Sequence, residues 1–399
     1  VMTMADNKDK KVLNVPALRF PGFTEEWRKD TLQNVVTFSN GKAHENCVDE
    51  NGSYILVNSK FVSTDGSVVK KVTSQLSPLS KSQFVMVMSD LPNGKALAKC
   101  YYIEEDNIYT LNQRICSFSA KNGNISRFLM YQINRNKYYL RFDDGINQTN
   151  LKKGEVLACP VFIPSVEEQK KIATFIHLLD ERIATQNKII EKLEALIKGL
   201  VVTHYSTTDH AIKVKIQELG KAYSTMVMSK EQLTNDGNPC IFYGELFTLY
   251  GCVIDEVKSR TSLEKASSTL SHGRDLLFPA STTVDALSLI APSALMQKGI
   301  ILGGDMFGIK VAEAYNPIYL SYYFNYIANK RLSKYAKGTT IIHLHYNEIA
   351  NIAIELPSNE EQGKVVSIIQ GYSTKLSIEE TILKKLSELK LYLLNQMFI

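Results

Sequence analysis

One short motif occurs twice in this chain and constrains its fold more than any other feature. PSVEEQ spans residues 164–169 and PSNEEQ spans residues 357–362, a shift of 193 residues. Each copy opens a long run of periodic apolar residues. The same shift aligns Gly145 with Gly338 and continues without a gap to Leu200 and Leu393. A repeat of this length indicates a tandem duplication.

Upstream of the motif the two halves match more weakly. LNQRI, from Leu111, aligns with LGGDM, from Leu302, at a shift of 191, and WRKDTLQNV, from Trp27, aligns with VKIQELGKA, from Val214. The segments between them contain short runs that are typical of strands joined by turns. We therefore expect two α/β (α+β) domains in tandem, each followed by a long α-helix. The expected parts are a disordered N-terminal segment 1–17, a first domain 18–163, its helix 164–204, a second domain 205–356 and its helix 357–399.

The repeated motif predicts a helix start. Ser165 and Ser358 are suited to N-cap a helix, and Glu168 and Glu361, three residues later, complete a capping box by reaching back to the amide of the cap. Carboxylates in the first turn also favour the positive end of a helix. Paired glutamates can serve in acid–base catalysis, but the helix start already accounts for both side chains.

Behind each cap the apolar residues follow a heptad pattern. The predicted seam comprises Ile176, Leu179, Ile183, Gln186, Ile190, Leu193, Ile197 and Leu200 in the first copy, and Ile369, Tyr372, Leu376, Glu379, Leu383, Leu386 and Leu393 in the second. Lys390 stands in the second copy where Ile197 stands in the first.

Such a seam requires a partner helix. We expect the two copies to pair as an antiparallel coiled coil with pseudo-two-fold symmetry, with Gln186 and Glu379 fixing the register. The alternative is that each helix packs on its own domain. About 35 helical residues span roughly 50 Å, and half-sites read by dimeric DNA-binding proteins lie roughly 34–36 Å apart. A paired rod of this length suits two domains that read separated half-sites.

Composition narrows the class of protein. A hydrophobic fraction of 44%, a charged fraction of 22% and a net charge of +5 are typical of a globular protein and permit a polyanionic partner. Neither a secretion signal nor a membrane span is expected. The six cysteines are scattered, which indicates reduced thiols in a cytoplasm. The chain lacks a P-loop and HExxH, and His343-x-His345 has no third ligand nearby, so no metal site is expected.

These motifs together resemble a known family. RFPGF and W-x-x-x-x-L, a variable region, the loop GINQTNLKKGEV and PSxEEQ with its long helix, in this order and largely repeated, resemble the specificity subunit of type I restriction-modification enzymes. The resemblance begins at about Leu18. GTTIIHLH, from Gly338, is similar to the same loop in another form. The second half departs from the pattern by having Val214 where the first has Trp27, which leaves the start of its domain open.

The resemblance implies a function. Two target recognition domains would each read one half of an asymmetric bipartite DNA site, and the helices would set the spacer and dock two modification (methyltransferase) subunits. Those partners would use S-adenosylmethionine, and restriction subunits would use ATP and magnesium for translocation and cleavage. The specificity subunit itself would be non-catalytic, bind no cofactor and lie in the bacterial cytoplasm. The alternative is a coiled-coil scaffold that joins proteins without sequence-specific DNA binding.

Candidate DNA contacts are polar and basic residues in the variable regions and in the two loops. Lys and Arg bind phosphates, and amides and hydroxyls can read base edges, although the loop side chains could equally close a turn. The candidates are Lys42, Lys60, Lys95, Arg114, Asn147, Gln148, Asn150, Lys152, Lys153, Arg274, Lys310, Lys337, Thr339, Thr340, His343 and His345.

Overall fold

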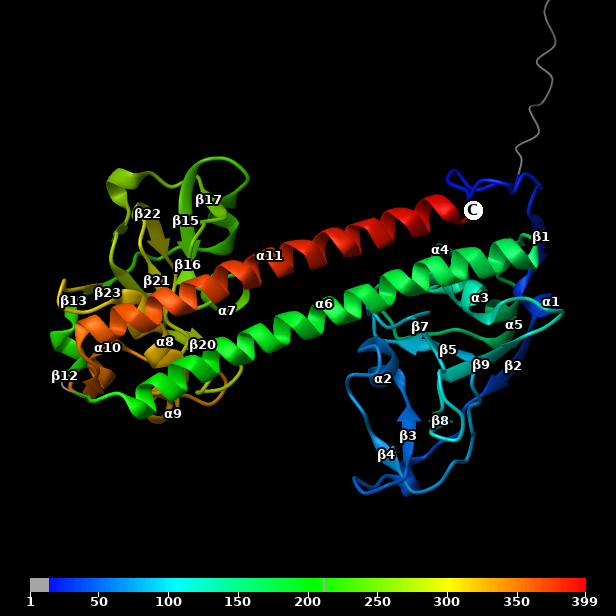
Figure 1. Ribbon diagram of the computed structural model, residues 1–399, viewed down its shortest axis with the longest axis horizontal. Coiled ribbons are helices and arrows are strands. Elements are labelled where there is room, and N and C mark those ends of the chain that lie inside the picture. The colour runs from blue at the N-terminus through cyan, green and yellow to red at the C-terminus, as the bar shows by residue number, and fades with distance from the viewer. Residues whose placement is uncertain (1–13, 211) are drawn as a thin grey trace, which may run out of the picture. The chain divides into compact units, whose positions relative to one another are not determined.

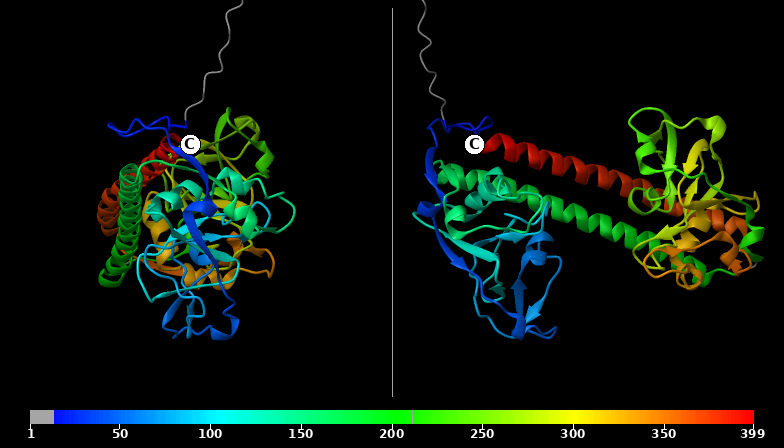
Figure 2. Two further views of the ribbon diagram at one scale, coloured as in Figure 1. Left: turned by 90° about the vertical axis from the view of Figure 1, so that its right-hand side faces the viewer. Right: turned by 180° about the vertical axis from the view of Figure 1, so that it is seen from behind.

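The computed structural model describes residues 14–210 and 212–399, and the chain divides into two compact units (Figure 1 and Figure 2). Unit 1 holds the residues up to Thr185 together with Leu383–Ile399, and unit 2 holds Gln186–Ile382. Residues 1–13 of the segment expected to be disordered lie outside the described residues. Immediately after them, the carbonyl of Asn14 accepts a hydrogen bond from the N–H of Trp27 at 2.8 Å.

Unit 1 contains two small sheets. The larger has the strand order β2 (Val36–Asn40), β9 (Ile115–Ala120), β5 (Phe84–Val87) and β7 (Cys100–Tyr102), and the smaller has β4 (Lys71–Val72), β3 (Tyr54–Val57) and β8 (Tyr109–Leu111). Two-stranded ladders join β1 (Arg28–Thr31) to β11 (Pro160–Ile163) and β6 (Ser89–Asp90) to β10 (Thr149–Asn150). The helices are α1 (Leu32–Val35), α2 (Ser59–Ser63), α3 (Ser126–Ile133), α4 (Lys137–Leu140), α5 (Lys153–Leu157), the first part of α6 (Val166–Thr207) and the last part of α11 (Asn359–Met397). Helix α3 lies against β5, β7 and β9.

Unit 2 repeats this plan with longer sheets. One has the order β13 (Gly220–Ser224), β23 (Met306–Val311), β19 (Asp275–Pro279), β21 (Ser293–Leu295) and β16 (Val253–Ile254). The other has β14 (Leu233–Thr234), β17 (Ser259–Thr261), β15 (Asn238–Phe242), β22 (Lys298–Gly303) and β18 (Leu270–His272). The ladders join β12 (Ile212–Lys215) to β25 (Ala353–Leu356) and β20 (Ser281–Thr282) to β24 (Ile342–His343). The helices are α7 (Glu245–Thr248), α8 (Pro317–Tyr326), α9 (Asn329–Leu332), α10 (Tyr346–Ile349), the last part of α6 and the first part of α11 (Asn359–Met397).

The strand registers confirm the duplication and correct one of its alignments. Strands β9 and β23 begin at Ile115 and Met306, as the predicted shift of 191 requires. In the ladders, however, Thr31 pairs with Pro160 and Lys215 pairs with Ala353. The opening segments therefore correspond at a shift of 184, and the alignment of WRKDTLQNV with VKIQELGKA was wrong by three residues. Short alternating segments match at several shifts, whereas a ladder has one hydrogen-bonding register.

The two long helices pair within each unit. In unit 2 the fully buried amide of Gln186 donates to the backbone carbonyl of Glu379 at 3.1 Å and to its carboxylate. Toward the other end of the same pair, His204 lies 3.6 Å from Glu361, so the helices run antiparallel. All residues of the predicted seam are buried or half-buried. The predicted contact between Gln186 and Glu379, the polar residues at the same level of the two seams, is thus present.

Unit 1 accounts for the lysine in the second seam. The ammonium of Lys390 lies 2.5 Å from the carboxylate of Asp180, which also accepts a hydrogen bond from the hydroxyl of Tyr131 at 2.6 Å. The equivalent positions of the repeat in unit 2 are Ile197 and Ser373, an uncharged combination. The helix pair of unit 1 thus contains one acid and one base that the helix pair of unit 2 lacks, and these two charges neutralise each other.

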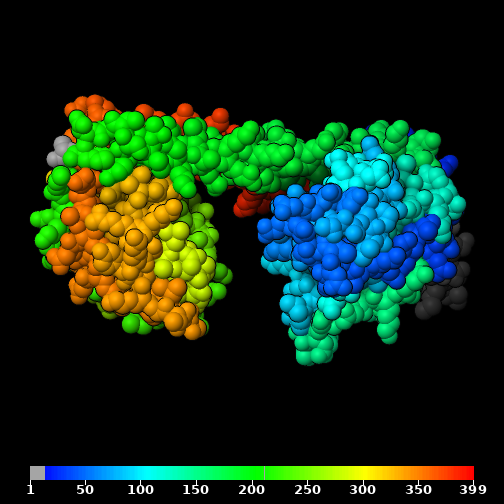
Figure 3. Space-filling view, turned by 90° about the horizontal axis from the view of Figure 1, so that it is seen from below, coloured from blue at the N-terminus to red at the C-terminus, as the bar shows by residue number. Residues whose placement is uncertain are grey.

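The long helices also close the hydrophobic cores, so pairing and domain packing occur together. The core of unit 1 includes Leu393 and Met397 from α11, and the core of unit 2 includes Ile197 and Val201 from α6. Figure 3 shows the C-terminal part of α6, in green, lying across the yellow and orange surface of unit 2. Near its start each long helix also packs on its own domain, through Ile176 in the core of unit 1 and Ile369 in the core of unit 2. Both alternatives, pairing with the other copy and packing on its own domain, therefore describe part of each helix.

The predicted serine caps form at both helix starts. The Ser165 hydroxyl oxygen accepts a hydrogen bond from the N–H of Glu168 at 3.3 Å, and Ser358 accepts one from Glu361 at 3.3 Å. Helices α6 and α11 begin one residue after these caps. The same local sequence therefore produces the same helix start twice.

The glutamate half of the predicted capping boxes requires a correction. The carboxylate of Glu168 accepts two hydrogen bonds from Arg19, both at 2.7 Å, and is only 1% exposed. In unit 2, Glu361 pairs with Lys364 at 2.7 Å. A carboxylate binds a cation more strongly than a neutral backbone N–H, and the planar guanidinium holds it through two bonds. A distant arginine could not be paired with the motif from its spacing alone.

The last residue of each motif ties the long helix to its domain. Gln169 and Gln362 are fully buried, and each donates to the carbonyl of the proline that opens its motif, at 3.0 and 2.9 Å. Their amide oxygens accept from the N–H groups of Ile125, at 2.9 Å, and Asn316, at 3.1 Å. These two residues are the N-caps of α3 and α8. Each glutamine therefore joins two helix starts through one buried side chain.

We predict that Gln169→Ala and Gln362→Ala each destabilise the protein by about 1–3 kcal/mol, because each leaves a buried backbone N–H and a carbonyl without this partner. Urea unfolding followed by circular dichroism measures the loss. Gln370→Ala, at an exposed position of α11, is the matched control. Equal stability of the buried and exposed variants would contradict the tie between the helix starts.

Candidate nucleic-acid interface

Four chain segments meet at one edge of unit 1. Lys42 forms a parallel bridge with Asn112. The carbonyl of Arg114 accepts from the N–H of Met88 at 2.9 Å, and the carbonyl of Met88 accepts from the N–H of Leu151 at 2.8 Å. These backbone bonds place the loop after β2, the turn before β9, the strand β6 and the loop around β10 side by side. We call this arrangement the unit 1 edge.

Unit 2 builds the same edge from the equivalent positions. Met226 bridges Gly303 in parallel, as Lys42 bridges its partner in unit 1. The carbonyl of Asp305 accepts from the N–H of Ala280 at 2.8 Å, whose own carbonyl accepts from the N–H of Leu344 at 2.9 Å. We call this the unit 2 edge. Because only backbone groups make these bonds, the side chains of the two edges are free to differ.

The unit 1 edge is basic. Lys42, Arg114, Lys152 and Lys153 are all exposed, and no ion pair between described residues involves them. The ammonium of Lys153 lies 5.3 Å from the ring centroid of Phe38, on β2. Four uncompensated cations at one edge can bind phosphates, and the arginine can also donate to base acceptors.

The amides of the first loop are largely occupied by the loop itself. Hydrogen bonds from the backbone N–H and the side-chain amide of Asn147 lower the pKa of Asp144 to about 2. Gln148 donates to the hydroxyl of Ser89 at 2.8 Å, and Asn150 donates to the carbonyl of Gln148 at 3.5 Å. These side chains hold the loop in shape against β6, and their remaining polar atoms stay exposed.

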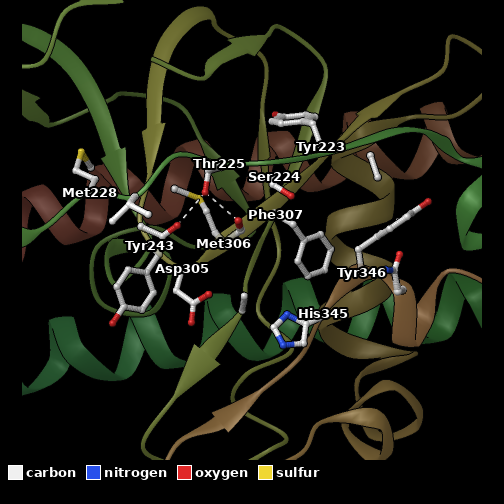
Figure 4. A pocket seen from close by; sticks show the side chains of 15 residues that line it. Tyr223, Ser224, Thr225, Met228, Tyr243, Asp305, Met306, Phe307, His345 and Tyr346 are labelled. Carbon is white, nitrogen blue, oxygen red and sulfur yellow. Dashed lines mark hydrogen bonds between the residues drawn. The ribbon is translucent and has the colours of Figure 1, made fainter. Parts of the chain in front are cut away.

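The unit 2 edge encloses a pocket of about 860 Å³ (Figure 4). Tyr223, Tyr243, Asp305, His345 and Tyr346 are among its lining residues, and no lysine or arginine is among those described there. The hydroxyl of Thr225, directly after β13, donates to the backbone carbonyls of Gly304 and Met306, as the dashed lines in Figure 4 show. These bonds hold the end of β13 to the start of β23. Aromatic, acidic and imidazole groups thus stand where unit 1 has cations.

The second loop is a tight turn beside this pocket. Lys337 and His343 exchange two backbone hydrogen bonds, at 2.8 and 2.7 Å, which leave Thr339 and Thr340 exposed at the tip. The imidazole of His343 lies 3.6 Å from the carboxylate of Asp305. Of the predicted loop residues of the second half, His345 therefore lines the pocket and His343 lies beside it.

Three other candidate lysines are exposed but differ in place. Lys95 belongs to a loop that contacts the first long loop, because Asn93 donates to the carbonyl of Gly145 at 3.2 Å. Lys60 lies on α2, next to the three-stranded sheet, and Lys310 lies on β23, beyond the turn that forms the unit 2 edge. The structure thus brings only the first of the three close to an edge.

The side chain of Arg274 binds backbone carbonyls and a carboxylate of its own unit. Its guanidinium donates to backbone carbonyls that follow β23, at 3.4, 3.2 and 2.6 Å, namely those of Val311, Ala312 and Tyr315. It also lies 3.5 Å from the carboxylate of Glu313. This side chain therefore stabilises the end of a strand, a role that residue type alone did not reveal.

Sequence reasoning missed the residues that distinguish the unit 2 edge. Met226, Tyr223 and Asp305 were not candidates, because none is basic or an amide. One signal was available: the alignment of LNQRI with LGGDM already placed Arg114 opposite Asp305. A difference between aligned positions therefore pointed to a residue that distinguishes the two edges, which positive charge alone did not.

The described residues, 14–210 and 212–399, contain neither a metal-ligand cluster nor a membrane-spanning helix. No cluster of three or more histidine, cysteine, aspartate or glutamate side chains in this part of the chain could hold a metal ion. No helix there is both long enough and apolar enough to span a membrane.

Comparison with protein families gives two matches along the chain. A family model described as "Type I restriction modification DNA specificity domain" matches residues 24–195 and again residues 211–388. The two matches cover one repeat each, and together they account for most of the chain.

Solved structures share the fold. The crystal structure of the S subunit of a type I restriction-modification system from M. genitalium has 15% sequence identity and a TM-score of 0.61, over 96% of this chain and 99% of that one. A chain from a study of complex assembly and conformational transition of the type I R-M system has 16% identity and a TM-score of 0.51, over 96% and 99%. These likenesses confirm the predicted fold class of two tandem domains with long helices.

Proposed function

The chain belongs to the family of type I restriction-modification specificity subunits, and from this premise we propose that each of its units reads one half of an asymmetric, bipartite DNA site. The observation that carries the proposal is the edge that occurs twice with the same backbone bonds and different side chains. Equivalent readers with unlike side chains select unlike half-sites, because base edges are distinguished by donors and acceptors.

In this proposal the two edges face DNA. Lys42, Arg114, Lys152 and Lys153 of unit 1 bind phosphates and base acceptors, supported by the exposed amides of the first loop. In unit 2 the turn at Thr339 and the pocket beside it make the corresponding contacts. The predicted contacts at Lys60 and Lys310 add charge farther from the edges, and Lys95 adds charge close to the unit 1 edge. Charge of this kind supports affinity more than sequence choice.

The exposed apolar residues of the helices support docking of two like partners. Phe175 and Ile368, at equivalent positions of the repeat, are 40% and 53% exposed, and Leu196 and Leu389 are 43% and 45% exposed. Unit 1 holds one residue of each pair and unit 2 holds the other. Exposed apolar positions that recur in this way favour two copies of one modification subunit, each bound to one unit.

The remaining steps belong to partners. We propose that the chain is non-catalytic, that modification subunits supply S-adenosylmethionine for DNA methylation, and that restriction subunits use ATP and magnesium. Such a complex works on DNA in the bacterial cytoplasm. The chain would contribute the choice of site and the spacing between half-sites.

The direct test is single-molecule methylation sequencing of DNA treated with this chain and its modification subunits. We expect one recurring motif of two different half-sites separated by a spacer of constant length. Methylation without sequence preference, or binding of all duplexes equally in gel-shift competition, would instead support a scaffold that does not read DNA.

The helices make a second prediction. Removing seven residues at equivalent positions, 183–189 of α6 and 376–382 of α11, shortens each helix by about 10 Å. If the paired helices set the spacer, its length should fall by about three base pairs, at 3.4 Å each. Methylation sequencing reads the new spacer directly, and an unchanged spacer in a folded, active variant would refute this role of the helices.

Docking makes a third prediction. Leu196→Asp or Leu389→Asp should weaken the binding of one modification subunit roughly 30-fold, as removal of a central apolar contact does, and leave the other copy bound. Native mass spectrometry at a concentration between the two affinities should show one partner with either variant and none with both together. Thr185→Asp, at another exposed position of α6, is the control. Two bound partners in every variant would contradict this surface.

A further inference from the structure

Arg114 and Asp305 occupy the same place in their repeats. Arg114 directly precedes β9, and Asp305 directly precedes the equivalent strand β23. The carbonyl of Arg114 accepts from the N–H of Met88 at 2.9 Å, and that of Asp305 accepts from the N–H of the equivalent Ala280 at 2.8 Å. Both side chains are exposed at an edge. One is a pure hydrogen-bond donor and the other, when ionised, a pure acceptor.

The surroundings of the two residues differ in the same sense. Around Arg114 the unit 1 edge presents Lys42, Lys152 and Lys153, whereas the equivalent residues of unit 2 are methionine, histidine and tyrosine. The unit 2 edge therefore lacks the cations at these positions that would hold a phosphate close to Asp305. A carboxylate repels phosphate, so Asp305 cannot contribute to backbone binding.

The carboxylate of Asp305 is available to a ligand. Its side chain is 45% exposed and lines the pocket of about 860 Å³. The imidazole of His343 lies 3.6 Å from this carboxylate, which is beyond hydrogen-bonding distance. The backbone of Asp305 is fixed by the bond to Ala280, so the side chain projects from a defined position.

We propose, on the basis of the proposed function, that Arg114 and Asp305 are matched specificity-determining residues with opposite hydrogen-bonding character. Arg114 donates to the O6 and N7 acceptors of a guanine in one half-site. Asp305 accepts from an exocyclic amino group, that of cytosine N4 or adenine N6, in the other half-site. In the major groove guanine is the base that presents two acceptors to an arginine, and cytosine N4 and adenine N6 are the only amino donors for a carboxylate.

The test uses the complete complex of this chain with its modification subunits, so that methylation reports the motif. Asp305→Ala should reduce discrimination at one base pair of one half-site about tenfold or more, the size of one good base contact, and leave the other half-site unchanged. Asp305→Asn keeps the shape of the side chain but replaces the carboxylate by an amide, which pairs with adenine N6 and N7. If the native base is cytosine, this variant should shift the preference to adenine. If the native base is adenine, the variant should keep it. Arg114→Gln should relax one guanine in the opposite half-site.

Asp255→Asn, at an exposed carboxylate of unit 2 outside the unit 2 edge, is the matched control and should leave both half-sites unchanged. If the wild type methylates a bipartite motif and both Asp305 variants keep it unaltered, the assignment of Asp305 is wrong while the proposed function stands. If Asp305 and Arg114 variants relax the same half-site, the assignment is equally wrong. If the wild type methylates no bipartite motif, the proposed function itself fails.

Discussion

The largest hydrophobic core of each unit depends on residues from the far end of a long helix. The core of unit 1 includes Leu393 and Met397, close to the C-terminus, and the ring of Phe398 lies 5.3 Å from that of Phe128. The core of unit 2 includes Val201, from the end of the first long helix. Neither repeat therefore builds a complete core from its own residues. Burial of these apolar side chains favours the covalent tandem arrangement, because it supplies each unit with the helix end that it needs.

The hydrogen bonds that support the two edges are the same in both units, whereas the side chains at the edges differ. The buried glutamines of the two motifs make the same pair of hydrogen bonds in both units, and the edges repeat the same backbone bonds. At the positions of Lys42 and Arg114, unit 2 instead has Met226 and Asp305. Backbone hydrogen bonds do not depend on side-chain identity, so exposed residues at these positions can change without altering the edge. This separation of constant support from variable side chains is what the proposed reading of two unlike half-sites requires.

Pairwise differences between the repeats are compensated within each unit. Asp180 and Lys390 occur together in unit 1, and the uncharged Ile197 and Ser373 occur together in unit 2. A lysine in the seam appeared from the sequence as a defect of the heptad pattern. Its partner is on the other helix, 210 residues away in the chain, so the pattern of one helix could not reveal it.

The sequence by itself determined the duplication, the two helix starts, the heptad seam and the order of the parts, because these depend on local patterns and on comparison of the chain with itself. The serine caps at Ser165 and Ser358 are local in the same sense. Only the tertiary structure decided that Glu168 binds Arg19, that Arg274 stabilises a strand end and that the opening segments correspond at a shift of 184. Each of these depends on groups that are distant in the chain, and a side chain takes the strongest partner that folding brings within reach.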